Sequence, residues 1–123
     1  MLQVGQLRNR SNECIFCRIA QHQVPADLVT EDQDVVAFKD IHPQAPVHVL
    51  IVPKAHIPHV SDLTETNVGV MAKAVLAANR LAKQFGVEEG YRLVVNCGSQ
   101  AGQSVWHLHL HLLGGRPMRW PPG

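Results

Sequence analysis

Apolar and polar residues alternate most strictly between Val105 and Leu113. A repeat of two residues is the pattern of a half-buried β-strand, because successive side chains of a strand point to opposite faces. One face of the predicted strand carries three imidazoles and the other carries three leucines that enter a core: His107, His109 and His111 against Leu108, Leu110 and Leu112. Neighbouring imidazoles are expected roughly 6.6 Å apart, since a strand rises about 3.3 Å per residue.

Other apolar segments predict four more strands and a short helix. Runs of β-branched and apolar residues indicate strands over 26–30, 35–39, 47–53 and 91–96. A helical turn is predicted over 14–20, with Phe16 and Ile19 facing inward, and Pro25 ends it. Connections between most strands are short, which favours an antiparallel sheet. The predicted fold class is therefore α+β, with a helix packed on one face of the sheet.

One long helix is predicted from about Thr64 to Phe85, opened by Ser61 and Asp62. Its apolar residues recur at steps of three and four, which gives one apolar face made of Val68, Met71, Val75, Ala78, Leu81 or Ala82, and Phe85. Gly86 is expected to end the helix, because glycine adopts the left-handed conformation at little cost.

Size, charge and cysteine content narrow the class of protein. The 123 residues fit one domain. We expect residues 1–12 to form a disordered leader and residues 13–123 to form a single domain. A formal net charge of +1 without a basic run gives no support for binding to nucleic acid or to a membrane surface. No apolar stretch approaches the ~20 residues of a membrane span. Three cysteines without a signal peptide favour a reducing compartment, so we expect a cytoplasmic protein.

The three aligned histidines allow three interpretations. They could be core residues satisfied by hydrogen bonds, ligands of a metal ion, or a nucleophile with supporting imidazoles. The strand alone does not choose between the last two interpretations.

Two neighbouring features add to the histidine strand. The loop that precedes it contains Gly98, Gly102, Gln103 and Ser104, and such loops can cradle phosphate oxygens with their backbone N–H groups. Asp40 follows a predicted strand, where its carboxylate could accept hydrogen bonds from a ribose diol or could simply cap the loop.

These motifs together resemble the histidine triad (HIT) superfamily, and more narrowly its branch of histidine triad nucleotide-binding proteins, the Hint branch. The resemblance rests on the His-Leu-His-Leu-His-Leu-Leu segment 107–113, the segment Asp40–His48, Gly102-Gln103-Ser104 and the final Trp-Pro-Pro-Gly. It implies a five-stranded antiparallel sheet with one long and one short helix, and two such sheets joined across a homodimer. It also implies an adenosine 5′-monophosphoramidase, which hydrolyses the P–N bond between AMP or GMP and an aminoacyl or lysyl amine without a catalytic cofactor.

The same resemblance suggests a role for each candidate residue. His109 would be the nucleophile, His111 and His48 would contact the phosphate, and His107 would order the ring of His109. Asp40 would hold the ribose. The base would lie among Phe16, Ile19, Phe38 and Ile41. The phosphate and leaving group would meet Asn96, Gly102, Gln103 and Ser104, and Trp120 would lie near the leaving group or reach the partner subunit.

A Cys-x-x-Cys pair, Cys14 and Cys17, is typical of half a zinc site. Some histidine triad proteins resemble this chain in pairing such cysteines with two histidines, which here would be His56 and His107. Two interpretations of these residues remain open: either they hold a structural zinc ion, or the cysteines form a metal-free pair at the edge of the core. Other functions also remain open: a dinucleoside polyphosphate hydrolase, a nucleotide-binding or scaffolding module, and a metallohydrolase that uses the triad as ligands.

Overall fold

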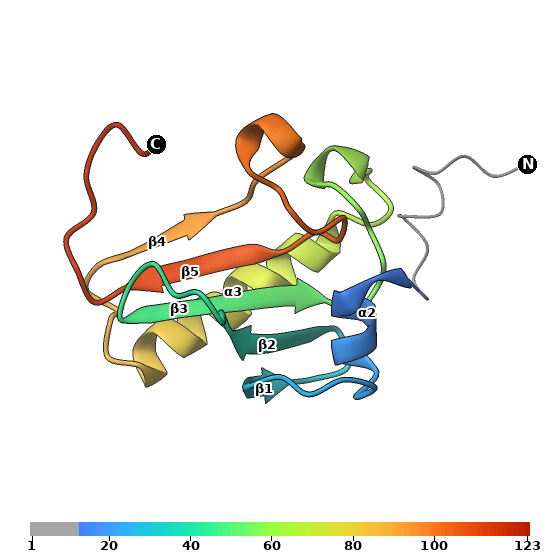
Figure 1. Cartoon of the computed structure of the whole chain (residues 1–123), viewed down its shortest axis with the longest axis horizontal. Coiled ribbons are helices and arrows are strands. Elements are labelled where there is room, and N and C mark those ends of the chain that lie inside the picture. Colours follow the sequence, from blue (N-terminus) through green and yellow to red (C-terminus); the bar gives the residue numbers. More distant parts are fainter. Residues whose placement is uncertain (1–12) are drawn as a thin grey trace, which may run out of the picture.

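A computed structural model describes residues 13–123 as one antiparallel sheet flanked by two helices (Figure 1). The predicted leader, residues 1–12, lies outside the described residues. The elements are α2 (Ile15–Ala20), β1 (Leu28–Glu31), β2 (Val35–Lys39), β3 (Val47–Pro53), the 3-10 turn η2 (Val60–Asp62), α3 (Gly69–Gln84), β4 (Tyr91–Val94), the 3-10 turn η3 (Ser99–Ala101) and β5 (Leu110–Gly114).

The strand order is β1-β2-β3-β5-β4, and every neighbouring pair is antiparallel. The predicted α+β fold with five antiparallel strands, one long helix and one short helix is therefore confirmed. β5 lies between β3 and β4, and Leu112 is aligned with Val49 on one side and Leu93 on the other. Because β5 is paired on both sides, the end of the histidine segment is held rigidly.

Two apolar clusters cover the two faces of the sheet. Helix α3 packs behind the sheet in the view of Figure 1, against one set of alternating residues that includes Val35, Ile51 and Leu112. Helix α2 packs on the other face, where Phe16 and Ile19 meet Phe38 and neighbouring residues of β2 and β3. Because both faces are covered, β2 and β3 are buried almost continuously.

Helix α3 begins five residues later than predicted, at Gly69 instead of Thr64. Residues 65–68 form turns instead, and the N–H groups of Val70 and Met71 donate three residues back, to the carbonyls of Asn67 and Val68, so regular α-helical bonding starts later. The predicted apolar face is also partly wrong. Val68 is exposed, and the buried residues are mainly small ones, which allow the helix to lie close to the sheet: Ala74, Ala77, Ala78, Leu81 and Ala82. Gly86 ends the helix with φ +73°, as expected.

The histidine segment pairs over a shorter range than predicted, because β5 begins only at Leu110. Its partner β3 aligns Ile51 with Leu110, and beyond that point the last residues of β3 pair with β2 alone. Residues 105–109 continue irregularly, with the backbone N–H of Leu108 bonded to the carbonyl of Ile57. Of the remaining strands, β2 and β3 match their predicted bounds, whereas β1 is shifted and β4 is shorter.

Leu112 is fully buried at the centre of the α3 side of the sheet, whereas Leu76 on α3 is 54% exposed. We expect Leu112→Ala to lower the free energy of unfolding by about 3 kcal/mol, because it removes packed methyl groups and leaves a cavity. Leu76→Ala is the matched control and should change it by less than about 0.5 kcal/mol. Urea unfolding of both variants checks this, and equal effects would show that the register of β5 is wrong.

Candidate active site

The three histidines run from the protein core to a cavity. His107 is completely buried, His109 is 7% exposed and His111 is half-buried. The rings of His109 and His111 lie 4.9 Å apart, and Phe16 packs edge-on against His109 at 5.0 Å. The shared face predicted for the histidines is therefore observed, but α2 covers most of it, and only its far end reaches the cavity.

Hydrogen bonds to backbone carbonyls determine which nitrogen of His107 and of His109 carries a proton. Nε2 of His107 lies 2.7 Å from the carbonyl oxygen of Pro53, so it must be the N–H donor, and Nδ1 keeps its lone pair. Nδ1 of His109 lies 2.7 Å from the carbonyl oxygen of His107 and must likewise donate. The lone pair of His109 is therefore on Nε2. Burial lowers the pKa of His109, so this nitrogen is unprotonated at neutral pH.

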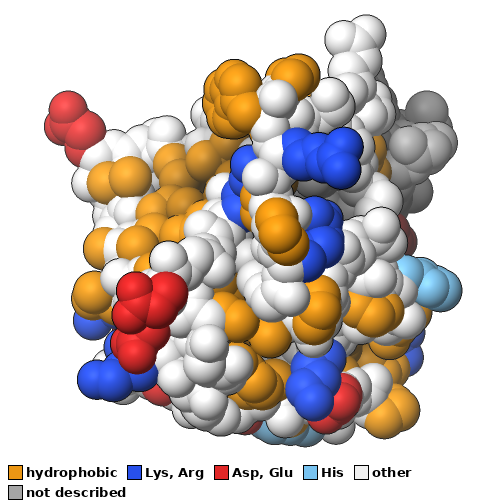
Figure 2. Space-filling view, turned by 90° about the vertical axis from the view of Figure 1, so that its left-hand side faces the viewer, with side chains coloured by type: hydrophobic (Ala, Val, Ile, Leu, Met, Phe, Trp, Pro, Cys, Tyr) orange, Lys and Arg blue, Asp and Glu red, His pale blue; other side chains and the backbone are white. Residues whose placement is uncertain are grey.

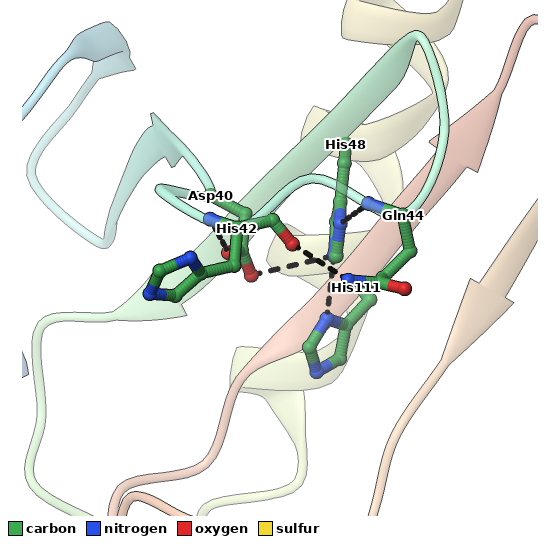
Figure 3. Close-up of polar contacts among 5 residues, drawn as sticks. All are labelled: Asp40, His42, Gln44, His48 and His111. Carbon is green, nitrogen blue, oxygen red and sulfur yellow. Dashed lines mark hydrogen bonds and ion pairs between the residues drawn. The ribbon is translucent and has the colours of Figure 1, made fainter.

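A second chain of hydrogen bonds orients His111 (Figure 3). The backbone N–H of Gln44 donates to Nδ1 of His48 at 3.0 Å, which leaves the proton of neutral His48 on Nε2. That proton points at Nδ1 of His111, 2.9 Å away. Neutral His111 then carries its own proton on Nε2. Burial, together with the neighbouring imidazoles of His109 and His48, lowers the pKa of His111 to about 4, so His111 is neutral at pH 7.

Asp40 stands beside this chain, with Oδ2 3.5 Å from Nε2 of His48. Its other carboxylate oxygen accepts the backbone N–H of His42 at 2.8 Å, so Asp40 does cap its own loop (Figure 3). Ligand atoms of Asp40, His48 and His111 lie within 4.8 Å of one another. A metal ion there would need the lone pair of Nε2 of His48, which would move the ring proton onto Nδ1, against the N–H of Gln44. The hydrogen bonds thus favour neutral His48 that donates a proton to His111 over a metal site at these three residues.

A cavity of about 470 Å³ opens beside His109 and His111. Eight residues of the predicted site line it: Phe16, Ile19, Phe38, Asp40, Ile41, Ser104, His109 and His111. Phe16 and Phe38 meet edge to face at 5.4 Å in this lining and give it an apolar surface. Sequence reasoning did not find the part of the wall that residues 24–27 form, because these residues carry no motif.

Gln103 is placed differently from the other predicted loop residues. It is buried, and its Nε2 donates to the carbonyls of Pro58 and Val105 at 2.7 and 3.0 Å. Its Oε1 accepts the N–H of Gly98 and Nδ1–H of His59, each at 2.8 Å. The Gln103 side chain therefore shapes the loop from within. His59, which sequence reasoning did not select, holds it there.

Three other predicted residues do not line the cavity within one chain. Asn96 and Gly102 lie next to each other in the loop between β4 and β5, and Trp120 is 83% exposed on the C-terminal tail. His48 and His107 also lie behind the wall, and each contacts a histidine that does line it.

The structure brings the two cysteines and two histidines of the predicted zinc site together. Nδ1 of His107 lies 3.2 Å from Sγ of Cys14 and 3.4 Å from Sγ of Cys17. Nδ1 of His56 lies 3.2 Å from both Sγ of Cys17 and Nδ1 of His107. Tetrahedral zinc with ordinary bond lengths separates two nitrogens by about 3.4 Å and a sulfur from a nitrogen by about 3.6 Å. The four donors therefore fit zinc, and Nδ1 of His107 is the nitrogen whose lone pair is available.

The thiol of Cys17 is in an environment that opposes a free thiolate. Burial raises its pKa to about 12, and the neighbouring Cys14 contributes. A bound cation would reverse this preference by stabilising the thiolate. The carbonyl of His107 accepts the Nδ1 proton of His109. The cysteine–histidine cluster is therefore connected, through His107, to the His109 ring at the cavity.

The fold and site define a small α+β protein in which a buried row of histidines ends at a cavity that is lined in part by aromatic side chains. A family model described as the HIT domain matches residues 21–118, and the chain belongs to this family. An uncharacterized HIT-like protein from Synechocystis is 45% identical over 92% of this chain and 99% of its own length.

Solved structures agree with the family. The crystal structure of a HIT family hydrolase from Legionella pneumophila is 51% identical, with a TM-score of 0.88 over 89% of this chain and 99% of that one. A structure described as a zinc-bound histidine triad family protein, from Mycobacterium smegmatis, is 29% identical, with a TM-score of 0.75 over 93% of this chain and 82% of that one. These matches support a hydrolase of the HIT family.

Among residues 13–123, no helix is both long and apolar enough to cross a membrane.

Proposed function

We propose that this protein is a Hint-branch nucleoside phosphoramidase, which hydrolyses the P–N bond between AMP or GMP and an amine such as that of lysine. The observation that carries the proposal is the lone pair of Nε2 of His109. It belongs to a neutral, buried ring that lines the cavity and is oriented by the carbonyl of His107. A neutral, oriented imidazole is a good nucleophile toward phosphorus, and covalent catalysis replaces one difficult displacement by two easier ones.

In the first step, Nε2 of His109 forms a bond to phosphorus while the P–N bond breaks, and the electron pair of that bond leaves with the amine, which takes up a proton from solvent water. The water that attacks in the second step returns a proton to solvent, so the two steps balance. Positive charge that develops on the His109 ring is stabilised by its Nδ1–H bond to the carbonyl of His107. In the second step, water attacks the nucleotidyl-histidine, and AMP or GMP is released with His109 restored. His107 is a positioning residue, because it acts through His109.

Two donors near His109 suit the charge on the phosphoryl oxygens. His111 presents Nε2–H, because its Nδ1 is occupied by the proton of His48. Ser104 contributes a hydroxyl from the loop at the cavity wall. Donors held in place before reaction stabilise the transition state without reorganisation. Zinc, when bound by Cys14, Cys17, His56 and His107, would supply structural support to this face of the sheet.

The shape of the cavity suits a nucleoside. A purine would pack against the apolar side chains of Phe16, Phe38 and Ile41 in the cavity lining, because aromatic side chains and flat bases pack well. One carboxylate oxygen of Asp40 is occupied by the backbone of its own loop. The other still has lone pairs for hydroxyl groups of the ribose.

We propose that two chains form the active homodimer. The face that carries the C-terminal tail shows hydrophobic side chains mixed with Lys and Arg (Figure 2). Trp120 is 83% exposed on this tail, which is unusual for so large an apolar side chain. A dimer would cover it and would let Trp120 approach the partner's cavity.

Cys14, Cys17 and Cys97 are all free thiols, which supports a cytoplasmic location.

An assay with an AMP–lysine phosphoramidate in the presence of a chelator tests the function. We expect release of AMP and lysine, and much slower cleavage of a diadenosine polyphosphate in the same assay. Faster cleavage of the polyphosphate would favour a dinucleoside polyphosphate hydrolase. Activity that disappears with chelator while circular dichroism shows the protein still folded, and that returns with divalent metal in Cys17→Ser as well as in the wild type, would favour a metallohydrolase. Tight AMP binding without cleavage of either compound would favour a nucleotide-binding module.

A further inference from the structure

A buried amide holds the loop that precedes β5. The side chain of Gln103 is 4% exposed, and hydrogen bonds occupy all of its polar positions. Its N–H groups donate to the carbonyls of Pro58 and Val105. Its oxygen accepts from the backbone of Gly98 and from the ring of His59. Because a buried polar network is rigid when every member is satisfied, this amide holds the loop in one conformation.

His59 is itself held in one orientation. The amide of Gln103 cannot be flipped, since only its nitrogen can donate to two carbonyl oxygens. Nδ1 of His59, 2.8 Å from the Gln103 oxygen, must therefore carry the ring proton. The ring also packs edge-on against Trp106, with ring centres 4.9 Å apart, and the backbone N–H of His59 donates to Asp62 in η2 at 3.1 Å. These contacts join the two loops that contain η2 and η3, which lie side by side in Figure 1.

Ser104 lies between two points that this amide fixes. Gln103 directly precedes it, and the carbonyl of Val105, directly after it, accepts a hydrogen bond from the same Gln103 side chain at 3.0 Å. Ser104 lines the main cavity together with His109. The place of Ser104 at the cavity wall therefore depends on Gln103 and, through Gln103, on His59.

We propose that His59 is a positioning residue for the reaction: it holds Gln103 so that the hydroxyl of Ser104 is in place to donate to a phosphoryl oxygen. The inference rests on the proposed function, because it takes phosphate to bind beside Ser104. Without the His59 donor, the buried oxygen of Gln103 would keep only one partner, and opening of the loop to water would satisfy it. A loosened Ser104 would have to be ordered again in the transition state, which slows the chemical step more than it weakens substrate binding.

Two substitutions separate the proton donor of His59 from its ring. His59→Asn keeps an N–H group the same number of bonds from the backbone and loses the ring, whereas His59→Phe keeps a ring and loses the N–H. With an AMP–lysine phosphoramidate, we expect His59→Phe to lower kcat about tenfold and to change KM less than about twofold, since a positioning residue contributes less than an oxyanion donor itself. His59→Asn should retain kcat within about twofold of the wild type.

A Ser104→Ala background tests whether His59 acts through Ser104. The hydroxyl is already missing there, so adding His59→Phe should lower kcat by less than about twofold more. Hydrogen exchange at the backbone N–H of Gly98, which shares the Gln103 oxygen with His59, needs no substrate. Exchange at Gly98 should be faster in His59→Phe than in His59→Asn and the wild type, because the loop opens more often.

Three kinetic results would overturn the positioning role: wild-type kcat in His59→Phe, the full tenfold loss in the Ser104→Ala background, or a His59→Asn protein as slow as His59→Phe. A wild-type protein that does not cleave the phosphoramidate would contradict the proposed function instead. In that case exchange at Gly98 decides the structural part alone: the predicted order supports it, and equal rates in all three proteins overturn it.

Discussion

Replacing His109 by alanine is expected to lower kcat for an AMP–amine phosphoramidate by about four orders of magnitude, the size seen when other enzymes lose their catalytic nucleophile. The physical reason is that Nε2 of His109 carries a lone pair at the cavity wall, because the proton of this ring is on Nδ1, where it bonds to the carbonyl of His107. Single-turnover and steady-state rates measure the loss. AMP affinity and the free energy of unfolding are measured alongside to show that the fold and cavity persist.

A surface histidine provides the matched control. His22 is exposed and pairs with Glu31 at 2.9 Å, away from the cavity that contains His109. Its φ is +60°, a conformation that asparagine also tolerates, so His22→Asn should keep wild-type activity. Near-normal turnover by His109→Ala would rule out the covalent mechanism.

The second large effect is expected from the cluster of Cys14, Cys17, His56 and His107. We expect wild-type protein to bind about one zinc ion per chain, and Cys17→Ser to weaken zinc binding at least about a hundredfold, since it removes one of four ligands. Zinc at a thousand times its dissociation constant should raise the free energy of unfolding by about 4 kcal/mol over the chelated protein, because it binds the folded chain.

Cys97 offers the control for the zinc experiment, because it is an exposed thiol outside the cluster. Cys97→Ser should bind zinc like the wild type and show the same stabilisation. Metal content by mass spectrometry and urea unfolding with and without chelator give the two readouts. A Cys17→Ser protein with wild-type zinc affinity, or a wild-type stability that zinc does not change, would show that these residues form a metal-free core.

Much of the fold could be predicted because local sequence and tertiary packing agree. The β-branched runs of β2 and β3 have the predicted bounds, and Gly86 ends α3. The start of α3 could not be predicted from apolar spacing, because residues 65–68 form turns whose backbone hydrogen bonds leave no signal in that spacing. The start of β5 depends on where its neighbour β3 turns to pair with β2 alone, which is a property of the sheet and not of the histidine segment.

The site was predictable where its chemistry lies in side chains of a recognised motif. The resemblance to the histidine triad family pointed to the four residues of the metal cluster, and the structure brings their donor atoms together. The tautomers were not predictable, because backbone groups of Gln44, Pro53 and His107 determine them, and a backbone N–H or carbonyl has no signature in the sequence. The inward Gln103 and its partner His59 were hidden for a similar reason, since a polar pair braces a loop only once the loop has folded.

The most direct test of the account is to trap the covalent intermediate. Protein is mixed with an AMP phosphoramidate labelled at phosphorus, denatured within one turnover under alkaline conditions that preserve a phosphorus–imidazole bond, and digested for mass spectrometry. The account predicts one nucleotidyl group on His109, absent from His109→Ala. A label on His107, His111 or His48 instead, or rapid turnover with no label on any histidine, would contradict it.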